Sequence, residues 1–257
     1  MRGIDVSSHQ GKIDWKSVKT SGIDFVIIRA GYGNSTVDKY FVQNITEALK
    51  IGLKVGIYWF SYALNEQDAR KEADFCISTV GPYKLSFPIF YDFEYDTERY
   101  ANDNKVKFTN KSRVSVIKAF CDRVKELGYE AGIYTNLDYI KYRLNFDDLR
   151  AYPLWLATYG GDESQTAYGE ILKQTTDSGK VSGIPGNVDM NVCFINFTDT
   201  DNEPSEWSKE AIEWAARNKI LQGDEKGDYK LREPCTTERF ITLLHRALKN
   251  IELDIGD

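Results

Sequence analysis

The chain is poor in the residues on which several common kinds of site depend. Only two histidines, His9 and His245, occur in 257 residues. A zinc site built on several imidazoles therefore cannot be assembled, which excludes most zinc hydrolases. The four cysteines lie far apart and form no C-x-x-C motif; they are Cys76, Cys121, Cys193 and Cys235. We expect all four to be buried free thiols, because the first two fall on apolar faces of predicted helices.

Clusters of one charge sign and long apolar runs are also missing. The 39 acidic and 33 basic residues give a net charge of -6, and no group of Lys and Arg interrupts the mixture. Nucleic acid is therefore not an expected partner. No apolar run is long enough to cross a membrane. A strand-like segment follows Met1 directly where a signal peptide would stand, so we expect the chain to be made and held in the cytoplasm.

Strand-like apolar segments alternate with segments of helical period over the first part of the chain. Strands are predicted at 3–6, 25–30, 55–62, 89–95, 131–135 and 154–157, and helices at about 39–51, 66–80, 112–127 and 137–144. This succession predicts an α/β fold with a parallel sheet, and the number of strands favours an irregular TIM-like β/α barrel over an open sheet. Antiparallel strands at 169–176 and 192–197 are expected to complete the domain.

Two segments of the chain repeat one pattern. Residues 49–58 and 124–134 each contain a helix end, a glycine and then Gly-Ile-Tyr in a strand. The first glycine of each suits the left-handed cap of a helix.

A small second domain is predicted at the end of the chain. The polar segment 198–205 has the composition of a linker, which divides the chain into a domain at 1–197, the linker 198–205 and a helical domain at 206–257. Thr236 or Thr237 should cap its second helix. About 50 residues are marginal for a stable domain, so this part should dock on the first domain, on another copy, or on a partner.

The segment 87–95 carries the strongest sign of chemistry. An apolar run ends there in two carboxylates, Asp92 and Glu94. If the run is a buried parallel strand, both side chains point to the same face. Two adjacent carboxylates in a partly dry pocket do not both ionise readily, so one can act as a general acid, as glycosidic bond cleavage requires. The alternative is that the acids only mark a solvated strand end.

Further acids and aromatic side chains are expected at the carboxyl ends of the strands, where a barrel collects its catalytic groups. The acids are Asp5, Asp92, Glu94 and Asp189, and the aromatic residues are Tyr32, Tyr58, Tyr134, Trp155 and Tyr159. An acidic centre surrounded by rings suits an extended sugar chain, although each tyrosine taken singly is more typical of a core. His9 has no evident carboxylate partner, so we expect it to cap the first loop rather than contact a ligand.

The sequence resembles the glycoside hydrolase family 25 muramidases in six motifs that occur in order over the first 197 residues. They are Asp5-Val-Ser-Ser-His-Gln-Gly11, Ile28-Arg-Ala-Gly-Tyr-Gly33, Gly56-Ile-Tyr58, Tyr91-Asp-Phe-Glu94, Leu154-Trp-Leu-Ala157 and Gly186-Asn-Val-Asp-Met-Asn191. The resemblance implies an irregular β/α barrel that cuts the β-1,4 bond between N-acetylmuramic acid and N-acetylglucosamine in bacterial peptidoglycan, without a metal or other cofactor.

The same resemblance implies a role for each acid. Glu94 matches the general acid, and Asp92 its charged partner, which stabilises positive charge at the sugar carbon or assists attack by the N-acetyl group. Asp5 and Asp189 match the acids that hold the sugar, and neighbouring carboxylates should raise the pKa of Glu94. Gln174 matches a retained binding position. This chain has Lys173 and Thr175 where the family usually has Trp and Tyr, which bears on substrate packing at that side.

Residues 206–257 resemble one surface-layer-homology repeat, a kind of domain that commonly binds secondary polymers of the bacterial wall. Self-association and packing against the barrel are the alternatives. The apparent lack of a signal peptide favours a phage endolysin, held in the cytoplasm until release, over an autolysin. Two other classes stay open: a wall-binding protein without catalysis, and a hydrolase whose four acids hold Mg²⁺ or Mn²⁺.

Overall fold

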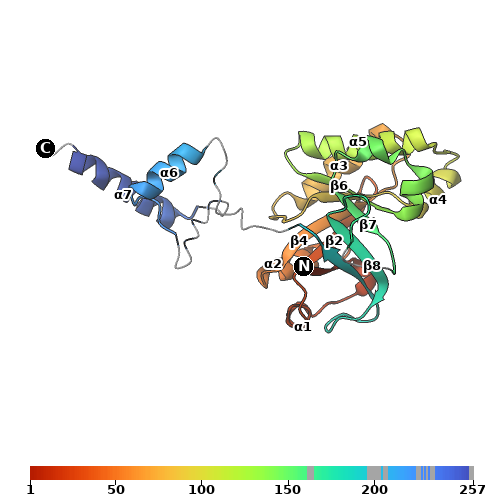
Figure 1. Cartoon of the computed structure of the whole chain (residues 1–257), viewed down its shortest axis with the longest axis horizontal. Coiled ribbons are helices and arrows are strands. Elements are labelled where there is room, and N and C mark those ends of the chain that lie inside the picture. The colour runs from red at the N-terminus through yellow and green to blue at the C-terminus, as the bar shows by residue number, and fades with distance from the viewer. Residues whose placement is uncertain are drawn as a thin grey trace. The chain divides into compact units, whose positions relative to one another are not determined.

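The computed structural model describes residues 1–160, 165–195, 204, 208–223, 227, 229, 231 and 235–254. The chain divides into two compact units, Met1–Ile195 and Asn196–Asp257. The strands are β1 (Arg2–Val6), β2 (Phe25–Tyr32), β3 (Thr36–Val37), β4 (Lys54–Phe60), β5 (Ile89–Asp92), β6 (Ala131–Asn136), β7 (Leu154–Ala157), β8 (Leu172–Gly179) and β9 (Val188–Cys193). The helices of the first unit are α1 (Trp15–Thr20), α2 (Phe41–Lys50), α3 (Glu66–Val80), α4 (Tyr95–Asp103) and α5 (Asn110–Glu126), with short turns η1 (Ser8–Gln10), η2 (Tyr139–Arg143) and η3 (Phe146–Leu149) (Figure 1).

Eight of these strands close into a barrel. They follow one another around the ring as β1-β2-β4-β5-β6-β7-β8-β9, and the ring closes because β1 pairs with both β2 and β9. Neighbours from β1 to β8 run parallel, whereas β9 runs antiparallel to β8 and β1. The short β3 pairs with β2 outside the ring. The predicted irregular α/β barrel is confirmed, with one correction: β8 is antiparallel to β9 but parallel to β7.

Large rings fill the interior of the barrel beside glycines on the neighbouring strands. A Cβ atom on Gly3 would lie 2.3 Å from the ring of Phe25, and one on Gly132 would lie 2.7 Å from the ring of Phe90. Both phenylalanines are fully buried. Because side chains alternate along a strand, residues two positions further toward the carboxyl end face the same interior. The sequence thus fills the lower barrel and leaves its upper end open for polar side chains.

This alternation explains the repeated Gly-Ile-Tyr pattern. Gly56 and Gly132 leave room inside the barrel, and Tyr58 and Tyr134 follow on the same face nearer the mouth. The isoleucine between them faces the opposite way, into the core that the strands share with the surrounding helices. The glycines that end the preceding helices, Gly52 and Gly128, have φ of 71° and 87°, which confirms the predicted left-handed caps.

Helices α3 and α5 pack against each other on the outside of the barrel (Figure 1). There α5 contacts β5 and β6, and α3 contacts β2. Tyr91 of β5 points outward, and its ring stacks on Phe120 of α5 with centroids 3.9 Å apart. The Tyr91 hydroxyl donates a 2.6 Å hydrogen bond to Glu72 of α3, whose side chain is buried. The outward face of β5 therefore fixes the strand whose inward face carries Asp92.

The structure corrects two further details of the first unit. The strand predicted at 89–95 ends at Asp92, and Glu94 precedes the unpredicted helix α4 as its N-cap residue. The last strand starts at Val188, four residues before the predicted start, so Asp189 lies inside it. The helix predicted at 137–144 is present at 137–143, where residues Tyr139–Arg143 form the wider π-helical turn η2. Polar α4 escaped prediction because it buries only Thr97 and Ala101 and so lacks an apolar stripe.

The second unit contains helices α6 (Lys209–Arg217) and α7 (Thr237–Asp254). The Thr236 hydroxyl accepts a 3.2 Å hydrogen bond from the backbone N–H of Arg239, as expected of the predicted cap. The predicted linker lies outside the described residues except for Pro204. Cys235 is exposed, contrary to expectation, whereas the other three cysteines are buried free thiols as predicted. Among the described residues, no helix combines the length and apolar character needed to cross a bilayer.

Candidate active site

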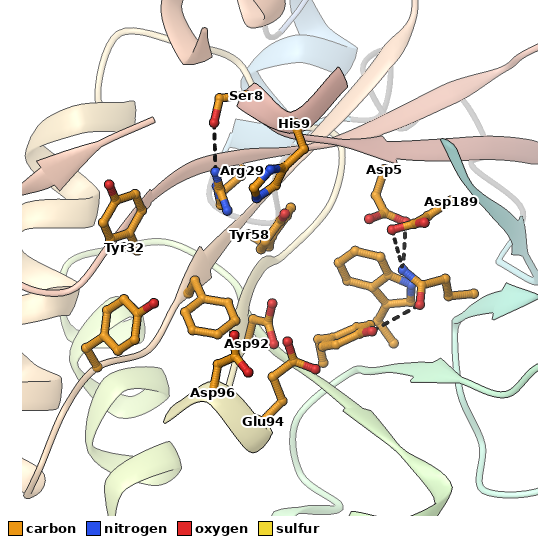
Figure 2. A pocket seen from close by; sticks show the side chains of 15 residues that line it. Asp5, Ser8, His9, Arg29, Tyr32, Tyr58, Asp92, Glu94, Asp96 and Asp189 are labelled. Atoms are coloured by element: carbon orange, nitrogen blue, oxygen red, sulfur yellow. Dashed lines mark hydrogen bonds between the residues drawn. The ribbon is translucent and has the colours of Figure 1, made fainter. Parts of the chain in front are cut away.

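A pocket of about 590 Å³ opens at the carboxyl ends of the parallel strands (Figure 2). Fifteen side chains line it: Asp5, Ser8, His9, Arg29, Tyr32, Tyr58, Phe60, Tyr62, Asp92, Glu94, Asp96, Tyr134, Trp155, Gln174 and Asp189. All four acids singled out in the sequence are among them, although β1, β5 and β9 lie far apart along the chain. The closed barrel brings them together.

The four predicted acids form two pairs across the pocket (Figure 2). Asp5 of β1 lies directly opposite Asp189 of β9 in the antiparallel ladder. Asp92 is the last residue of β5, and Glu94 follows two residues later with extended backbone angles, φ -144° and ψ -163°. Both side chains of each pair therefore face the same space, as the alternation of a strand requires.

Gln174 of β8 connects the first pair of acids to two tyrosines. Its side-chain nitrogen donates to Asp5 at 2.9 Å and to Asp189 at 3.5 Å. Its oxygen accepts hydrogen bonds from the hydroxyls of Tyr134 at 3.0 Å and Tyr159 at 2.9 Å. All four neighbours thus fix one orientation of the amide, and Gln174 is a rigid part of the pocket wall.

The predicted aromatic residues occupy different positions around the pocket. Tyr32, Tyr58 and Tyr134 line it with half-buried rings. Trp155 forms part of the floor, where Tyr58 and Tyr134 pack against its ring and leave it 1% exposed. A ring so covered does not suit the sugar-stacking role expected from the sequence. Tyr159 is 54% exposed and does not line the pocket, but it reaches the site through its hydrogen bond to Gln174.

Arg29 is a functional candidate that the sequence reasoning missed. Arg29 is the one arginine or lysine among the fifteen lining residues that the structure describes. An ion pair of 2.7 Å with buried Asp38 and a 2.9 Å hydrogen bond from Arg29 to the Ser8 hydroxyl hold its side chain in place. The strand alternation from Phe25 through Ile27 to Arg29 was a usable signal, because it puts all three side chains inside the barrel.

Two other lining residues, and one residue beneath the lining, differ from what the sequence predicted. His9 is exposed and lines the pocket, and the residue that caps η1 is Ser7, so the predicted capping role of His9 is wrong. Asp96 adds a fifth carboxylate next to Glu94. Asn191, beneath the lining, donates a 2.7 Å hydrogen bond to Asp5.

The two residues that depart from the family pattern lie outside the pocket. Lys173 and Thr175 flank Gln174 on β8, so they point away from the barrel interior, and both are buried there. Lys173 lies 3.8 Å from Glu170, and the Thr175 hydroxyl donates to a backbone carbonyl. The departure therefore affects the outer packing of β8 and leaves the pocket side unchanged, contrary to our expectation.

Burial raises the pKa of every predicted acid, and repulsion from other carboxylates adds to the rise. Burial, followed by the charges of Asp96 and Asp189, raises the pKa of Glu94 to about 7. Burial also raises the pKa of Asp92 well above its usual range, together with repulsion from Glu94 and Asp5, while Arg29 opposes the rise. Asp92 and Glu94 therefore do not both carry a negative charge at neutral pH, and the two carboxyl groups share one proton. Burial contributes more to the raised pKa values of Asp92 and Glu94 than repulsion from neighbouring carboxylates does. The sequence had suggested repulsion as the cause.

The second pair of acids shows the same behaviour. Burial and the charge of Asp189 raise the pKa of Asp5 well above its usual range, although hydrogen bonds from Gln174 and Asn191 oppose the rise. Burial likewise raises the pKa of Asp189. Among the described residues, no three His, Cys, Asp or Glu side chains are grouped so that they could hold a metal ion. The arrangement suits proton transfer and charge stabilisation by carboxyl groups.

The fold is a closed β/α barrel, and pairs of acids lie at the carboxyl ends of its strands. This combination is typical of barrel glycoside hydrolases that use two carboxyl groups for catalysis. The profile of Glycosyl hydrolases family 25 matches residues 4–184, and the chain belongs to this family. A second profile, that of the S-layer homology domain, matches residues 196–230.

Named relatives agree with this assignment. The autolytic lysozyme of Clostridium acetobutylicum is 29% identical over 190 residues, which are 74% of this chain and 55% of that protein. The modular autolysin LytC from Streptococcus pneumoniae is 32% identical and superposes with a TM-score of 0.66, covering 75% of this chain and 46% of its own. A bacterial lysozyme from Streptomyces coelicolor is 26% identical with a TM-score of 0.68, covering 77% and 94%. The chain spans about half the length of the first two of these relatives.

Proposed function

We propose that the chain is a muramidase that hydrolyses the β-1,4 bond between N-acetylmuramic acid and N-acetylglucosamine of bacterial peptidoglycan. The observation that carries the proposal is the pocket in which Asp92 and Glu94 lie side by side with raised pKa values. Family membership supports the substrate, as does the pneumococcal relative, whose structure includes a complex with a synthetic peptidoglycan ligand.

In the proposed mechanism Glu94 donates a proton to the leaving glycosidic oxygen. Asp92 stabilises the positive charge that develops at the sugar carbon, directly or through the N-acetyl group. Asp5 and Asp189, held by Gln174, bind the sugar and keep the field of the pocket negative. The half-buried rings of Tyr58 and Tyr134 pack against the sugar, and Tyr32 lies toward the other end of the pocket (Figure 2).

Loss of turbidity of susceptible cell walls tests the activity. The purified full chain should clear the walls, and the rate should be unchanged by EDTA. Binding without clearing would favour the alternative of a wall-binding protein that lacks catalysis. Clearing that EDTA abolishes would instead favour a hydrolase that uses its acids as metal ligands.

The activity should fall as the pH rises through about 7. Glu94 must be protonated to act as the general acid, and its pKa is about 7, so kcat/KM should drop about tenfold for each pH unit above that value. The charge of Asp96 contributes to this raised pKa, so Asp96→Asn should move the alkaline limb to lower pH. Initial clearing rates from pH 5 to 9 measure both curves. An unmoved limb in Asp96→Asn would contradict the assignment.

Replacing Gln174 with leucine should lower kcat/KM about 10²-fold. The change removes the donor shared by Asp5 and Asp189 and leaves the hydroxyls of Tyr134 and Tyr159 without their acceptor. Thr175→Ser is the matched control, because Thr175 is the next residue on the strand and points out of the barrel. Equal losses in both variants would indicate a general disturbance of β8 rather than a role in the pocket.

We also propose that the C-terminal unit binds a secondary polymer of the bacterial wall. The S-layer homology match supports this, and so does a cavity of about 670 Å³ whose lining includes the cations Lys209 and Arg217 of α6, which suit an anionic polymer. Co-sedimentation of the full chain with purified walls should weaken in the double variant Lys209→Gln/Arg217→Gln.

Self-association is the other candidate, favoured by the exposed apolar side chains of α7: Phe240, Ile241, Leu244 and Leu248. A dimer or larger species in analytical ultracentrifugation, lost in Leu244→Ser/Leu248→Ser, would favour it.

A further inference from the structure

A second cavity lies next to the catalytic pocket and shares two wall residues with it. This distal cavity has a volume of about 260 Å³ and is lined by Tyr32, Gly33, Asn34, Ser35, Thr36, Tyr62, Leu64, Asp68, Glu72 and Tyr100. Tyr32 and Tyr62 belong to both linings. Figure 2 shows Tyr32 at the opposite end of the catalytic pocket from Asp5 and Asp189. A chain that leaves the acids in that direction reaches the distal cavity next.

The wall between the two cavities is rigid. The ring of Tyr62 packs against Phe60, Tyr100 and Tyr32, with centroid distances of 5.2 Å, 5.0 Å and 6.0 Å. Its backbone N–H donates a 2.8 Å hydrogen bond to Glu72, whose side chain is 1% exposed. The distal cavity is therefore preformed, and a ligand would not have to order its wall on binding.

The turn between β2 and β3 forms the opposite side of the distal cavity and is fixed as well. The indole N–H of Trp59 donates a 3.0 Å hydrogen bond to the carbonyl of Gly33, and the Gly33 N–H donates to the carbonyl of Phe60 at 3.0 Å. Gly33 has a φ of 60°, a conformation that glycine adopts without strain. This turn holds Asn34 and Ser35 at the rim.

The groups that face the distal cavity suit an uncharged sugar. Tyr100 of α4 presents a ring that is 42% exposed. Asn34 and Ser35 are exposed, and their side chains form no hydrogen bond with the described residues, so amide and hydroxyl groups are available to sugar hydroxyls. The acids of the lining are Asp68, which forms an ion pair of 3.5 Å with Lys71, and Glu72, which is buried, and the described lining contains no lysine or arginine. This disfavours a carboxylate ligand.

We propose that the distal cavity binds an N-acetylglucosamine unit of the glycan strand, beyond the sugars that flank the scissile bond, and makes the enzyme prefer long strands. The proposal rests on the proposed muramidase function. N-acetylglucosamine fits the chemistry of the lining because it is uncharged, whereas the described residues of the lining offer no lysine or arginine to pair with the carboxylates of N-acetylmuramic acid and its stem peptide.

Glycan strands of defined length test this proposal. The full-length chain is incubated with peptide-free strands of four and of eight sugars, and kcat/KM for cleavage is measured for each length. The wild type should prefer the longer strand by about tenfold or more, and Tyr100→Ala and Asn34→Ala should each reduce that ratio severalfold, toward one. Tyr142→Ala is the matched control, because Tyr142 is 73% exposed and lines neither cavity, so the ratio should not change.

Each other outcome counts against a particular statement. A wild-type ratio near one, or a ratio that Tyr100→Ala and Asn34→Ala leave unchanged, would overturn the distal sugar site. A length preference that appears only when the strands carry stem peptides would show that the cavity binds peptide instead of sugar. Failure of the wild type to cleave either strand would overturn the proposed muramidase function itself.

Discussion

Replacing Glu94 with glutamine is expected to lower kcat on peptidoglycan by about 10³-fold. Glutamine keeps the shape of the side chain but has no proton of suitable acidity to give to the leaving oxygen, and general acid catalysis commonly contributes about 10²- to 10⁴-fold. The other three predicted acids should not take over, because Asp92 is shorter and Asp5 and Asp189 lie on the other side of the pocket (Figure 2). Release of reducing ends from purified walls measures the loss.

The matched control for this substitution is Glu130→Gln. Glu130 is exposed and immediately precedes β6, at the end of the barrel away from the pocket. The control should retain the wild-type rate. A rate of Glu94→Gln within about tenfold of the wild type would exclude Glu94 as the proton donor.

The same substitution should make the protein more stable at high pH. The pKa of Glu94 is raised from the usual 4.5 to about 7, so the folded chain binds this proton more tightly than the unfolded chain. The wild type therefore loses stability as the pH rises from about 4.5 to about 7, and the loss persists above that range. Glu94→Gln avoids it and should gain about 1 to 3 kcal/mol at pH 8, with no gain at pH 4. Urea unfolding at the two pH values measures the difference.

Replacing Asp92 with asparagine is expected to lower kcat by about 10²- to 10³-fold. The substitution removes the negative charge beside the sugar carbon, where positive charge develops in the transition state, and charge stabilisation of this kind is a large part of catalysis. The carboxyl group of Asp92 lines the pocket, where a substrate group can reach it. KM should change much less than kcat, because the charge acts mainly on the transition state.

Two substrates separate the possible actions of Asp92. If Asp92 orients the N-acetyl group, a wall whose muramic acid lacks that acetyl should be cut slowly by the wild type and should show little further loss in Asp92→Asn. If Asp92 acts on the sugar carbon directly, the loss in the variant should be equal on both walls. An Asp92→Asn variant with the wild-type kcat on both would contradict any catalytic role for this residue.

The barrel could be predicted because its strands are buried on both faces. Such strands appear in the sequence as short continuous apolar runs, and the runs of β1, of β2 and of β4 to β7 were found with small errors at their ends. The helix α4 was not found, because it is polar and buries little. The start of β9 was also missed, because Asp189 and Asn191 interrupt its apolar residues and leave no continuous apolar run.

The acids of the pocket could be predicted from their places at strand ends, but their surroundings could not. Asp96 enters the site because it lies in the first turn of α4, which was not predicted, whereas Arg29 was missed although the alternation along its strand places it inside the barrel. Gln174 was found only by resemblance, since nothing in the sequence shows that its amide joins residues 5 and 189. Conversely, Trp155 was expected to stack on sugar, but its neighbours cover both the ring and its N–H group.

The identity of the reducing-end sugar tests the central claim most directly. Purified peptidoglycan is digested with the full-length chain, the new reducing ends are reduced with borohydride, and the fragments are separated and analysed by mass spectrometry. A muramidase leaves N-acetylmuramic acid at the new reducing end, so the reduced form of that sugar is the predicted product. Fragments that end in reduced N-acetylglucosamine, or that arise from a cut stem peptide, would contradict the account.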